Sequence, residues 1–249
     1  MKTLPGPQDL REGFLTRCFS GRIFSGEVFR SALRSCKVTM SCVERDDGAL
    51  LRTFGGNKMH QIILISGKQG SGKTTLQNAL IKELLKASYV ALKINFADAI
   101  YKMHDDILSF IKQYGIKRDI KKDGPLLQLL GTEWGRKTIS ENIWIDILKG
   151  RIKNFVTDSV DNPQNKFFFI VGDCRFQNEL SAFPDALKIR LECNAGVRRQ
   201  RCEQWRDNDM HASEIDLDGQ LKRFDMVFDT AHFSVASIIA QVMEKLEIK

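Results

Sequence analysis

A glycine-rich segment between a buried strand and a helix constrains this chain more than any other feature. The run Ile62-Ile63-Leu64-Ile65 is short, continuous and rich in β-branched residues, as is typical of strands buried on both faces of a parallel sheet. The segment Gly67–Thr74 reads G-K-Q-G-S-G-K-T and matches the phosphate-loop pattern G-x-x-x-x-G-K-(S/T). Apolar residues follow at helical spacing, namely Leu76, Leu80, Ile81 and Leu84. This order of strand, turn and helix favours a nucleoside triphosphate site over a glycine turn that matches by chance.

The residue types of this loop suit a polyphosphate. Glycines let the backbone curl so that successive N–H groups point inward, and the start of the following helix favours negative charge. Lys73 is expected to bridge the β- and γ-phosphates of ATP, and the Thr74 hydroxyl is expected to bind Mg²⁺. The predicted nucleotide-binding residues are Gly67, Lys68, Gln69, Gly70, Ser71, Gly72, Lys73, Thr74 and Thr75. Because ATPases, GTPases, transporters and small-molecule kinases share such a loop, it does not by itself identify a reaction.

Strand and helix patterns alternate along the rest of the chain. Further strands are expected at Tyr89–Ile94, Phe167–Val171, Ala186–Leu191 and Phe224–Phe228. Helices are expected at Thr74–Lys86, Ala97–Gln113, Pro125–Thr138, Ser140–Phe155 and Ser234–Leu246. The alternation predicts an α/β fold with three layers, in which residues 97–157 form a helical insertion between the second and third strands.

Residues 1–58 differ from this pattern. They lack sustained periodicity, apart from a mildly helical stretch at Glu27–Leu33. Because Met59 stands directly before the first convincing strand, we interpret residues 1–58 as an N-terminal extension that is poorly structured or not native to the core. A targeting peptide and a small accessory domain are the alternatives. The P-loop domain is expected to span residues 59–249.

Composition and charge exclude several classes of protein. Hydrophobic residues make up 43% of the chain and charged residues 28%, and no apolar run is long enough to cross a bilayer. The six cysteines form no zinc or redox motif. The chain has 38 Lys and Arg residues and 31 Asp and Glu residues. Residues 1–58 contain ten of the basic and six of the acidic residues, which leaves 28 basic and 25 acidic residues in 59–249. We therefore expect a cytoplasmic protein with no membrane segment and no stable nucleic-acid partner.

Two carboxylates follow expected strands at the edge where ligands bind. Asp173 comes after the third strand and can hold Mg²⁺ as a Walker-B acid does, while Arg175 can reach a phosphate from the same edge. The alternative is an Asp-Arg pair that caps the next turn. Asp98 follows the second strand, and the sequence leaves open whether it positions an acceptor hydroxyl or a magnesium-bound water, or caps a helix.

Two groups of basic residues are candidates for phosphate binding. In the stretch Gly131–Arg136, Arg136 can clamp an acceptor phosphate and Trp134 can line a base pocket; the alternative is a glycine-interrupted helix with a core Trp. Five arginines lie at the end of the fourth strand and after it, namely Arg190, Arg198, Arg199, Arg201 and Arg206. We expect a lid over residues 194–218 with Arg199 as a catalytic cation, whereas the alternative is a solvated helix face.

Several motifs resemble the deoxynucleoside monophosphate kinases of tailed bacteriophages and related bacteria. The matching stretches are Phe96-Ala97-Asp98, Leu127–Arg136, Asn142-Ile143-Trp144, Asp173–Glu179 and His211-Ala212-Ser213-Glu214, which with the loop span about residues 61–230. The resemblance implies an adenylate-kinase-like core with strand order 2-3-1-4-5, a requirement for ATP and Mg²⁺, and an acceptor side that carries Arg136. No role for His211–Glu214 follows from the residues.

Together these observations predict a nucleotide kinase that transfers the γ-phosphoryl group of ATP to a deoxynucleoside monophosphate. The predicted catalytic residues are Lys73, Arg136, Asp173, Arg175 and Arg199; the acceptor residues are Asp98, Trp134, Arg136 and Arg175; the metal ligands are Thr74 and Asp173. A kinase of another small phosphorylated metabolite and an ATP-hydrolysing switch or motor subunit are the alternatives. The oligomeric state stays open, with a homodimer as one alternative.

Overall fold

The computed structural model describes residues 53–54, 57–58, 60–116, 122–159, 166–202, 205 and 212–248. All of them belong to one unit of the chain, Asp47–Lys249. Most of the predicted N-terminal extension, including Glu27–Leu33, therefore lies outside the described residues. In the described part of this extension, β1 (Thr53–Phe54) and β2 (Asn57–Lys58) form an antiparallel hairpin. None of the helices in the described ranges is both long and apolar enough to cross a membrane.

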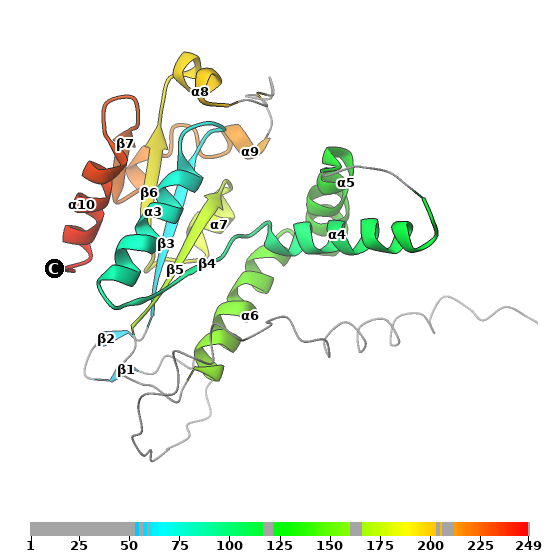
Figure 1. The fold of residues 1–249 in the computed structure, drawn as a ribbon, viewed down its shortest axis with the longest axis horizontal. Helices are drawn as coiled ribbons and strands as arrows, with labels where there is room; N and C mark the ends of the chain where they lie inside the picture. Colours follow the sequence, from blue (N-terminus) through cyan, green and yellow to red (C-terminus); the bar gives the residue numbers. More distant parts are fainter. Residues whose placement is uncertain are drawn as a thin grey trace, which may run out of the picture. The chain divides into compact units, whose positions relative to one another are not determined.

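A parallel sheet of five described strands forms the centre of this unit (Figure 1). The strands are β3 (His60–Gly67), β4 (Val90–Lys93), β5 (Phe167–Cys174), β6 (Leu187–Glu192) and β7 (Met226–Asp229). Their order is β4-β5-β3-β6-β7, and every neighbouring pair is parallel. Counted from β3, this is the predicted order 2-3-1-4-5, so the α/β fold class and the topology are confirmed.

Helices cover both faces of the sheet. Successive residues of β3 point to opposite faces, so that Ile63 and Leu64 belong to separate apolar clusters. The cluster around Ile63 includes α3 (Lys73–Lys86) and α10 (Val235–Lys245), which lie on the same side of the sheet in Figure 1. The cluster around Leu64 includes α6 (Ile143–Asp158). The continuous apolar strands are thus buried from both sides, which gives three layers.

The insertion between β4 and β5 contains a long π-helix. It consists of α4 (Asp98–Gln113), α5 (Gly124–Gln128), the π-helix η2 (Leu129–Ile139) and α6. The sequence predicts one continuous helix over Pro125–Thr138, and the structure divides it. Trp144 explains the packing of this region, because its indole Nε1 donates to Gly131 O at 2.8 Å and its ring lies against Gly135. A Cβ on Gly135 would come within 2.4 Å of that ring.

The remaining elements are short and lie around the ends of the strands. They are α7 (Gln177–Ser181), α8 (Ala195–Arg201), α9 (Ala212–Ile215) and the 3₁₀-helix η3 (Leu221–Arg223). The third strand extends three residues beyond its predicted end, so Asp173 lies inside β5. The last strand begins at Met226 instead of Phe224, and the Phe224 side chain is buried in the apolar cluster around Leu64.

Candidate functional site

The phosphate-loop segment forms a tight turn between β3 and α3. Gly70 has a φ of 76°, in the left-handed region that favours glycine, and a Cβ there would lie 2.7 Å from Arg198 O. A Cβ on Gly67 would lie 2.5 Å from Ser71 Oγ. The loop leads into the 14-residue helix α3, whose N-cap, Gly72, provides no side-chain hydrogen bond. Gly72 therefore does not cap the first amides of α3, and their binding of an anion stays a prediction.

The Lys73 side chain folds back over the loop. Its ammonium donates to Gly67 O at 2.6 Å and to Lys68 O at 2.8 Å. Burial lowers the pKa of Lys73 to about 7, and the positive charge of Arg175 acts in the same direction. A triphosphate would add negative charge beside this amine, so the donor set of the loop fits a nucleotide polyphosphate. Thr74 and Thr75 are exposed at the start of the helix.

Asp173 lies beside the loop but also has a structural contact. In the pairing of β5 with β3, its neighbour Cys174 lies opposite Ser66, at the edge predicted for the Walker-B acid. One carboxylate oxygen accepts from Phe96 N at 3.0 Å and the other from Ala97 N at 2.9 Å. Burial raises the pKa of Asp173, while these two N–H donors act in the opposite direction. Asp173 thus fixes the turn after β4 to the end of β5.

The magnesium site stays a prediction. Within the described ranges, no group of three or more His, Cys, Asp or Glu side chains could hold a metal ion by itself. A site made of Thr74, one carboxylate and phosphate oxygens does not need such a group, because Mg²⁺ in phosphoryl-transfer sites takes one or two protein ligands plus substrate oxygens.

Asp98 begins α4, and its carboxylate points back to the preceding turn. It accepts from Asn95 N at 2.9 Å and from Arg151 Nη1 at 3.1 Å. Asn95 Oδ1 in turn accepts from Gly172 N at 3.0 Å and from Gln77 Nε2 at 3.0 Å. These contacts give Asp98 a structural role at the start of α4, and they connect α4 and α6 to the edge of the sheet. Its predicted contact with an acceptor remains a prediction.

The structure brings two predicted motifs together at Arg136. Its guanidinium lies 4.1 Å from the centre of the Phe176 ring, and its Nη2 is 2.5 Å from Glu179 Oε1. Glu179 is buried and also accepts from Arg175 N at 2.8 Å. Sequence reasoning did not assign Glu179 a role, although its place in the Asp-x-Arg-Phe-x-Asn-Glu stretch was a signal. Trp134, the predicted base contact, is 39% exposed on η2.

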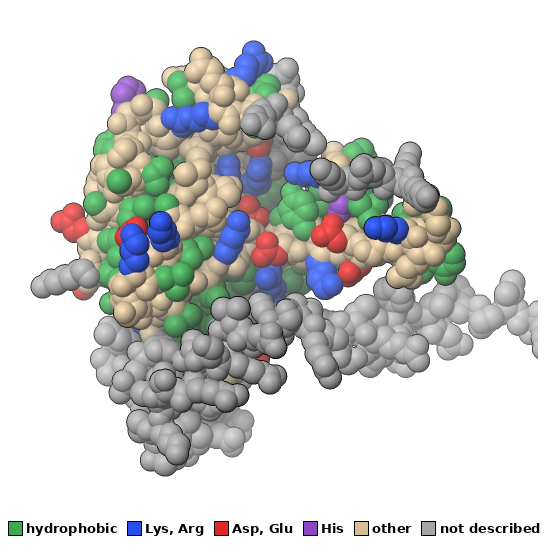
Figure 2. All heavy atoms as spheres, viewed as in Figure 1, with side chains coloured by type: hydrophobic (Ala, Val, Ile, Leu, Met, Phe, Trp, Pro, Cys, Tyr) green, Lys and Arg blue, Asp and Glu red, His purple; other side chains and the backbone are tan. Residues whose placement is uncertain are grey.

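The predicted arginine cluster separates into several environments. Arg190 is buried on β6, where it donates to Ser66 Oγ at 3.1 Å and pairs with Glu192 and Asp218. Arg198 donates to Gln69 O at 3.1 Å. Two of the predicted cluster therefore support the loop itself. Figure 2 shows basic and acidic side chains close together in the recessed area between the sheet and helices α4 and α5.

The other arginines of the cluster have different partners. Arg199, predicted to be catalytic, lies 5.5 Å from the centre of the Trp205 ring. Arg201 donates to Thr230 O at 2.9 Å. Arg206 lies outside the described residues. The predicted lid over residues 194–218 begins with α8, and its middle part also lies outside the described residues.

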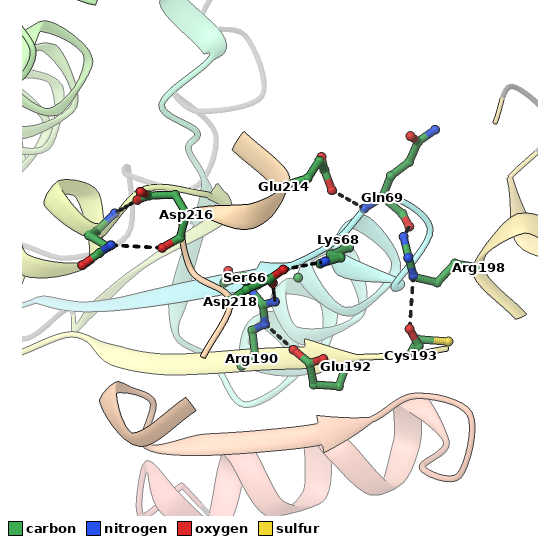
Figure 3. A network of polar contacts seen from close by, with 12 residues as sticks. Ser66, Lys68, Gln69, Arg190, Glu192, Cys193, Arg198, Glu214, Asp216 and Asp218 are labelled. Carbon is green, nitrogen blue, oxygen red and sulfur yellow. Dashed lines mark hydrogen bonds and ion pairs between the residues drawn. The ribbon is translucent and has the colours of Figure 1, made fainter. Parts of the chain in front are cut away.

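Glu214 is a buried acid beside the loop that sequence reasoning left without a role. Its Oε2 accepts from Gln69 N at 2.9 Å, and its Oε1 pairs with Arg175 Nη1. Farther along the same segment, Asp218 pairs with Lys68 at 2.7 Å (Figure 3). Paired cations and carboxylates, some buried and some partly exposed, thus lie around the phosphate-loop segment.

Comparisons with known proteins reveal structural relatives only. No protein-family model matches the sequence, and no curated protein matches it. A shikimate kinase from Bacteroides thetaiotaomicron is 15% identical, with 75% of this chain and 98% of that chain covered and a TM-score of 0.44. The APS kinase CysC of Mycobacterium tuberculosis, solved in complex with AMPPNP and APS, is 12% identical, with 76% and 98% covered and a TM-score of 0.45. TT1252 from Thermus thermophilus is 14% identical, with 75% and 95% covered and a TM-score of 0.46. The fold assignment therefore rests on the strand order and the loop of this chain.

Proposed function

We propose that this protein is an ATP-dependent phosphotransferase whose acceptor is a deoxynucleoside monophosphate. The observation that carries the proposal is the buried Lys73 ammonium inside the loop, with the Arg175 guanidinium close enough to lower its pKa. Cations held close together at the start of a helix match the charge of a polyphosphate. They also match the transition state of phosphoryl transfer, in which negative charge spreads over the transferred group.

Each residue of the loop and of the adjacent strand end has a proposed role in binding ATP. The ammonium of Lys73 and backbone N–H groups of Gly67–Thr75 bind the phosphates, apart from Gln69 N, which donates to Glu214, and Ser71 N, which donates to Lys68 O. Arg175 neutralises charge that develops on the transferred group. Thr74 and Asp173 would hold Mg²⁺, which would neutralise part of the charge of the phosphates. Because a phosphate oxygen of the acceptor attacks the γ-phosphorus in line while the bond to the leaving ADP breaks, the residues need only position both partners, and no covalent enzyme intermediate is required.

The acceptor is assigned to the side of the insertion. Arg136 is held by Glu179 and by the Phe176 ring, so its guanidinium is oriented before an acceptor binds. Trp134 offers an exposed flat surface on the same helix. The resemblance of Gly131–Arg136 and Asp173–Glu179 to phage-type deoxynucleoside monophosphate kinases selects this acceptor over other phosphorylated metabolites. Asp98 and Arg199 complete the proposed set of acceptor and transition-state contacts.

A panel assay tests this proposal. Full-length protein is incubated with Mg²⁺, ATP and each of the four deoxynucleoside monophosphates, with the ribonucleotides and other small phosphorylated metabolites as comparisons. We expect ADP and a deoxynucleoside diphosphate to form in equal amounts. ADP formation without a phosphorylated acceptor would favour the ATP-hydrolysing switch, and transfer only to another metabolite would favour a different small-molecule kinase.

Two matched lysine variants connect this activity to the loop. Lys73→Met removes the ammonium that bonds to Gly67 O and Lys68 O, and we expect it to reduce turnover by at least about a thousandfold. Lys82→Met removes an exposed charge from the same helix and should leave turnover unchanged. Near-normal activity in folded Lys73→Met would reject the assignment of the loop.

A further inference from the structure

Glu214 connects the phosphate loop to Arg175 through a single carboxylate. One of its oxygens accepts from Gln69 N at 2.9 Å, and the other pairs with Arg175 Nη1. Gln69 and Glu214 are 145 residues apart in the sequence, so this contact is a product of the fold. Because hydrogen bonds to charged groups are stronger and more directional than neutral ones, the carboxylate fixes the guanidinium relative to the loop backbone.

The exposure of the two partners is unequal. The Glu214 side chain is 3% exposed, whereas the Arg175 side chain is 32% exposed. The acid is therefore buried, whereas part of the Arg175 side chain is exposed to solvent. A carboxylate that faced the polyphosphate directly would repel it. The geometry suits an acid that acts through the arginine and does not touch the substrate.

The segment that carries Glu214 is anchored independently of it. Asp216 accepts from Gln177 N at 2.7 Å, and Asp218 pairs with Lys68 and Arg190 (Figure 3). Both contacts follow Glu214 in the chain, and they keep the backbone of residues 216–218 in place. Replacing the Glu214 carboxylate should therefore change the Arg175 contact without releasing the whole segment.

We propose that Glu214 is a positioning residue, which holds the Arg175 guanidinium beside Gln69 of the phosphate loop for phosphoryl transfer. This inference rests on the proposed function, because it assumes that Arg175 binds a phosphate. The role also explains why an acid lies next to a predicted anion site: the carboxylate is neutralised by the arginine that it orients. In addition, the Glu214 charge favours the ammonium form of Lys73, against burial and Arg175, which both lower its pKa.

Kinetics of Glu214→Gln test the proposal. Glutamine keeps the shape and can still accept from Gln69 N, but it lacks the negative charge that holds Arg175. Since small displacements of a positioned group are costly, kcat should fall by about tenfold or more, while KM for ATP changes by less than about threefold. In an Arg175→Ala background, the same substitution should have little further effect, because the group that it positions is gone. An undiminished kcat, or equal losses in both backgrounds, would overturn the role of Glu214.

Two further variants distinguish the loss of positioning from a folding defect. Asp216→Asn alters the same segment but contacts Gln177 instead of the loop, so kcat should stay within about twofold of the wild type. Glu214→Asp keeps the charge but is one methylene shorter, so it cannot reach both Gln69 N and Arg175. If Glu214→Gln does not fold, Glu214→Asp should show the loss of kcat, and a wild-type kcat there would contradict the proposal.

A spectroscopic readout separates this inference from the proposed reaction. In full-length protein with ¹⁵N-labelled arginine, the Arg175 guanidinium signals, assigned with Arg175→Ala, should shift in Glu214→Gln and stay in place in Asp216→Asn. This measurement needs no turnover. If the wild type phosphorylates no acceptor, the proposed function fails while the spectra still test the pairing. Unshifted Arg175 signals in Glu214→Gln would reject the positioning role whatever the reaction.

Discussion

Lys73 shows at the scale of a single residue how burial prepares a site for an anion. In the unfolded chain its pKa is near 10.5, and in the folded protein burial brings it to about 7. Between these values the unfolded state binds more protons than the folded state, so the free energy of unfolding increases as pH rises from about 7 to about 10.5. Below pH 7 this contribution is constant. Binding of a polyphosphate reverses the effect, because adjacent negative charge favours the ammonium form.

We therefore predict that nucleotide binding at pH 8 is accompanied by uptake of close to a full proton. Calorimetric titration of AMPPNP in two buffers with different ionisation enthalpies measures this uptake directly. Lys82→Met, which changes an exposed lysine on the same helix, should show the same uptake as the wild type. Binding heats that do not depend on the buffer would show that Lys73 is already charged in the free protein.

Arg136 is oriented by contacts that a lysine cannot reproduce. Its planar guanidinium stacks on Phe176 and pairs with Glu179. We predict that Arg136→Lys raises KM for the acceptor by about tenfold and leaves KM for ATP nearly unchanged, because the two substrates contact different sides of the site. Steady-state kinetics with each substrate varied in turn provide the test. Lys137→Arg on the same helix serves as the control, and a parallel rise in both KM values would contradict the assignment.

The geometry of the π-helix depends on the contact of its residues with Trp144 of α6. Gly135 allows the Trp144 ring to approach, whereas a Cβ at this position would lie 2.4 Å from that ring. We predict that Gly135→Ala lowers the free energy of unfolding by about 1–3 kcal/mol, as overpacking of a well-packed region does. Chemical denaturation monitored by circular dichroism measures the change.

Gly150 provides a matched control for this substitution. It lies in α6, and a Cβ there would meet nothing within 4 Å. Gly150→Ala should therefore be neutral or should stabilise the protein by about 0.4–1 kcal/mol, because alanine restricts the unfolded chain and favours the helix. Equal effects at the two positions would show that the Trp144 contact does not determine the π-helix.

At the scale of the whole molecule, ligand binding and folding stability are coupled through the loop. The loop joins the central strand β3 to α3, and both belong to the buried core. A ligand that binds only the folded state at about 100 times its Kd adds about 2.7 kcal/mol. For a chain of this size, we predict that AMPPNP raises Tm by roughly 5–10 °C. Differential scanning calorimetry measures the shift, which should be absent in Lys73→Met and retained in Lys82→Met.

Local patterns in the sequence predict most of the architecture. The apolar strand before Gly67, the glycine spacing and the helical period after Lys73 each depend on neighbouring residues, since backbone conformation and side-chain period are local properties. The strands at 62–65, 89–94 and 167–171 were therefore located to within a few residues. The strand order came from the resemblance to a family, and the structure confirms it.

The contacts within the candidate site had to come from the tertiary structure. The Arg136–Glu179 pair joins residues 43 positions apart, and the Gln69–Glu214 contact joins residues 145 positions apart. No periodic pattern encodes such pairs, because they depend on how β5 aligns with β3 and on where the segment after α8 returns to the loop. The division of Pro125–Thr138 into α5 and a π-helix likewise depends on Trp144, which packs from the next helix. The sequence by itself determined the loop and the layers around it; side-chain packing across the fold decided which charges meet.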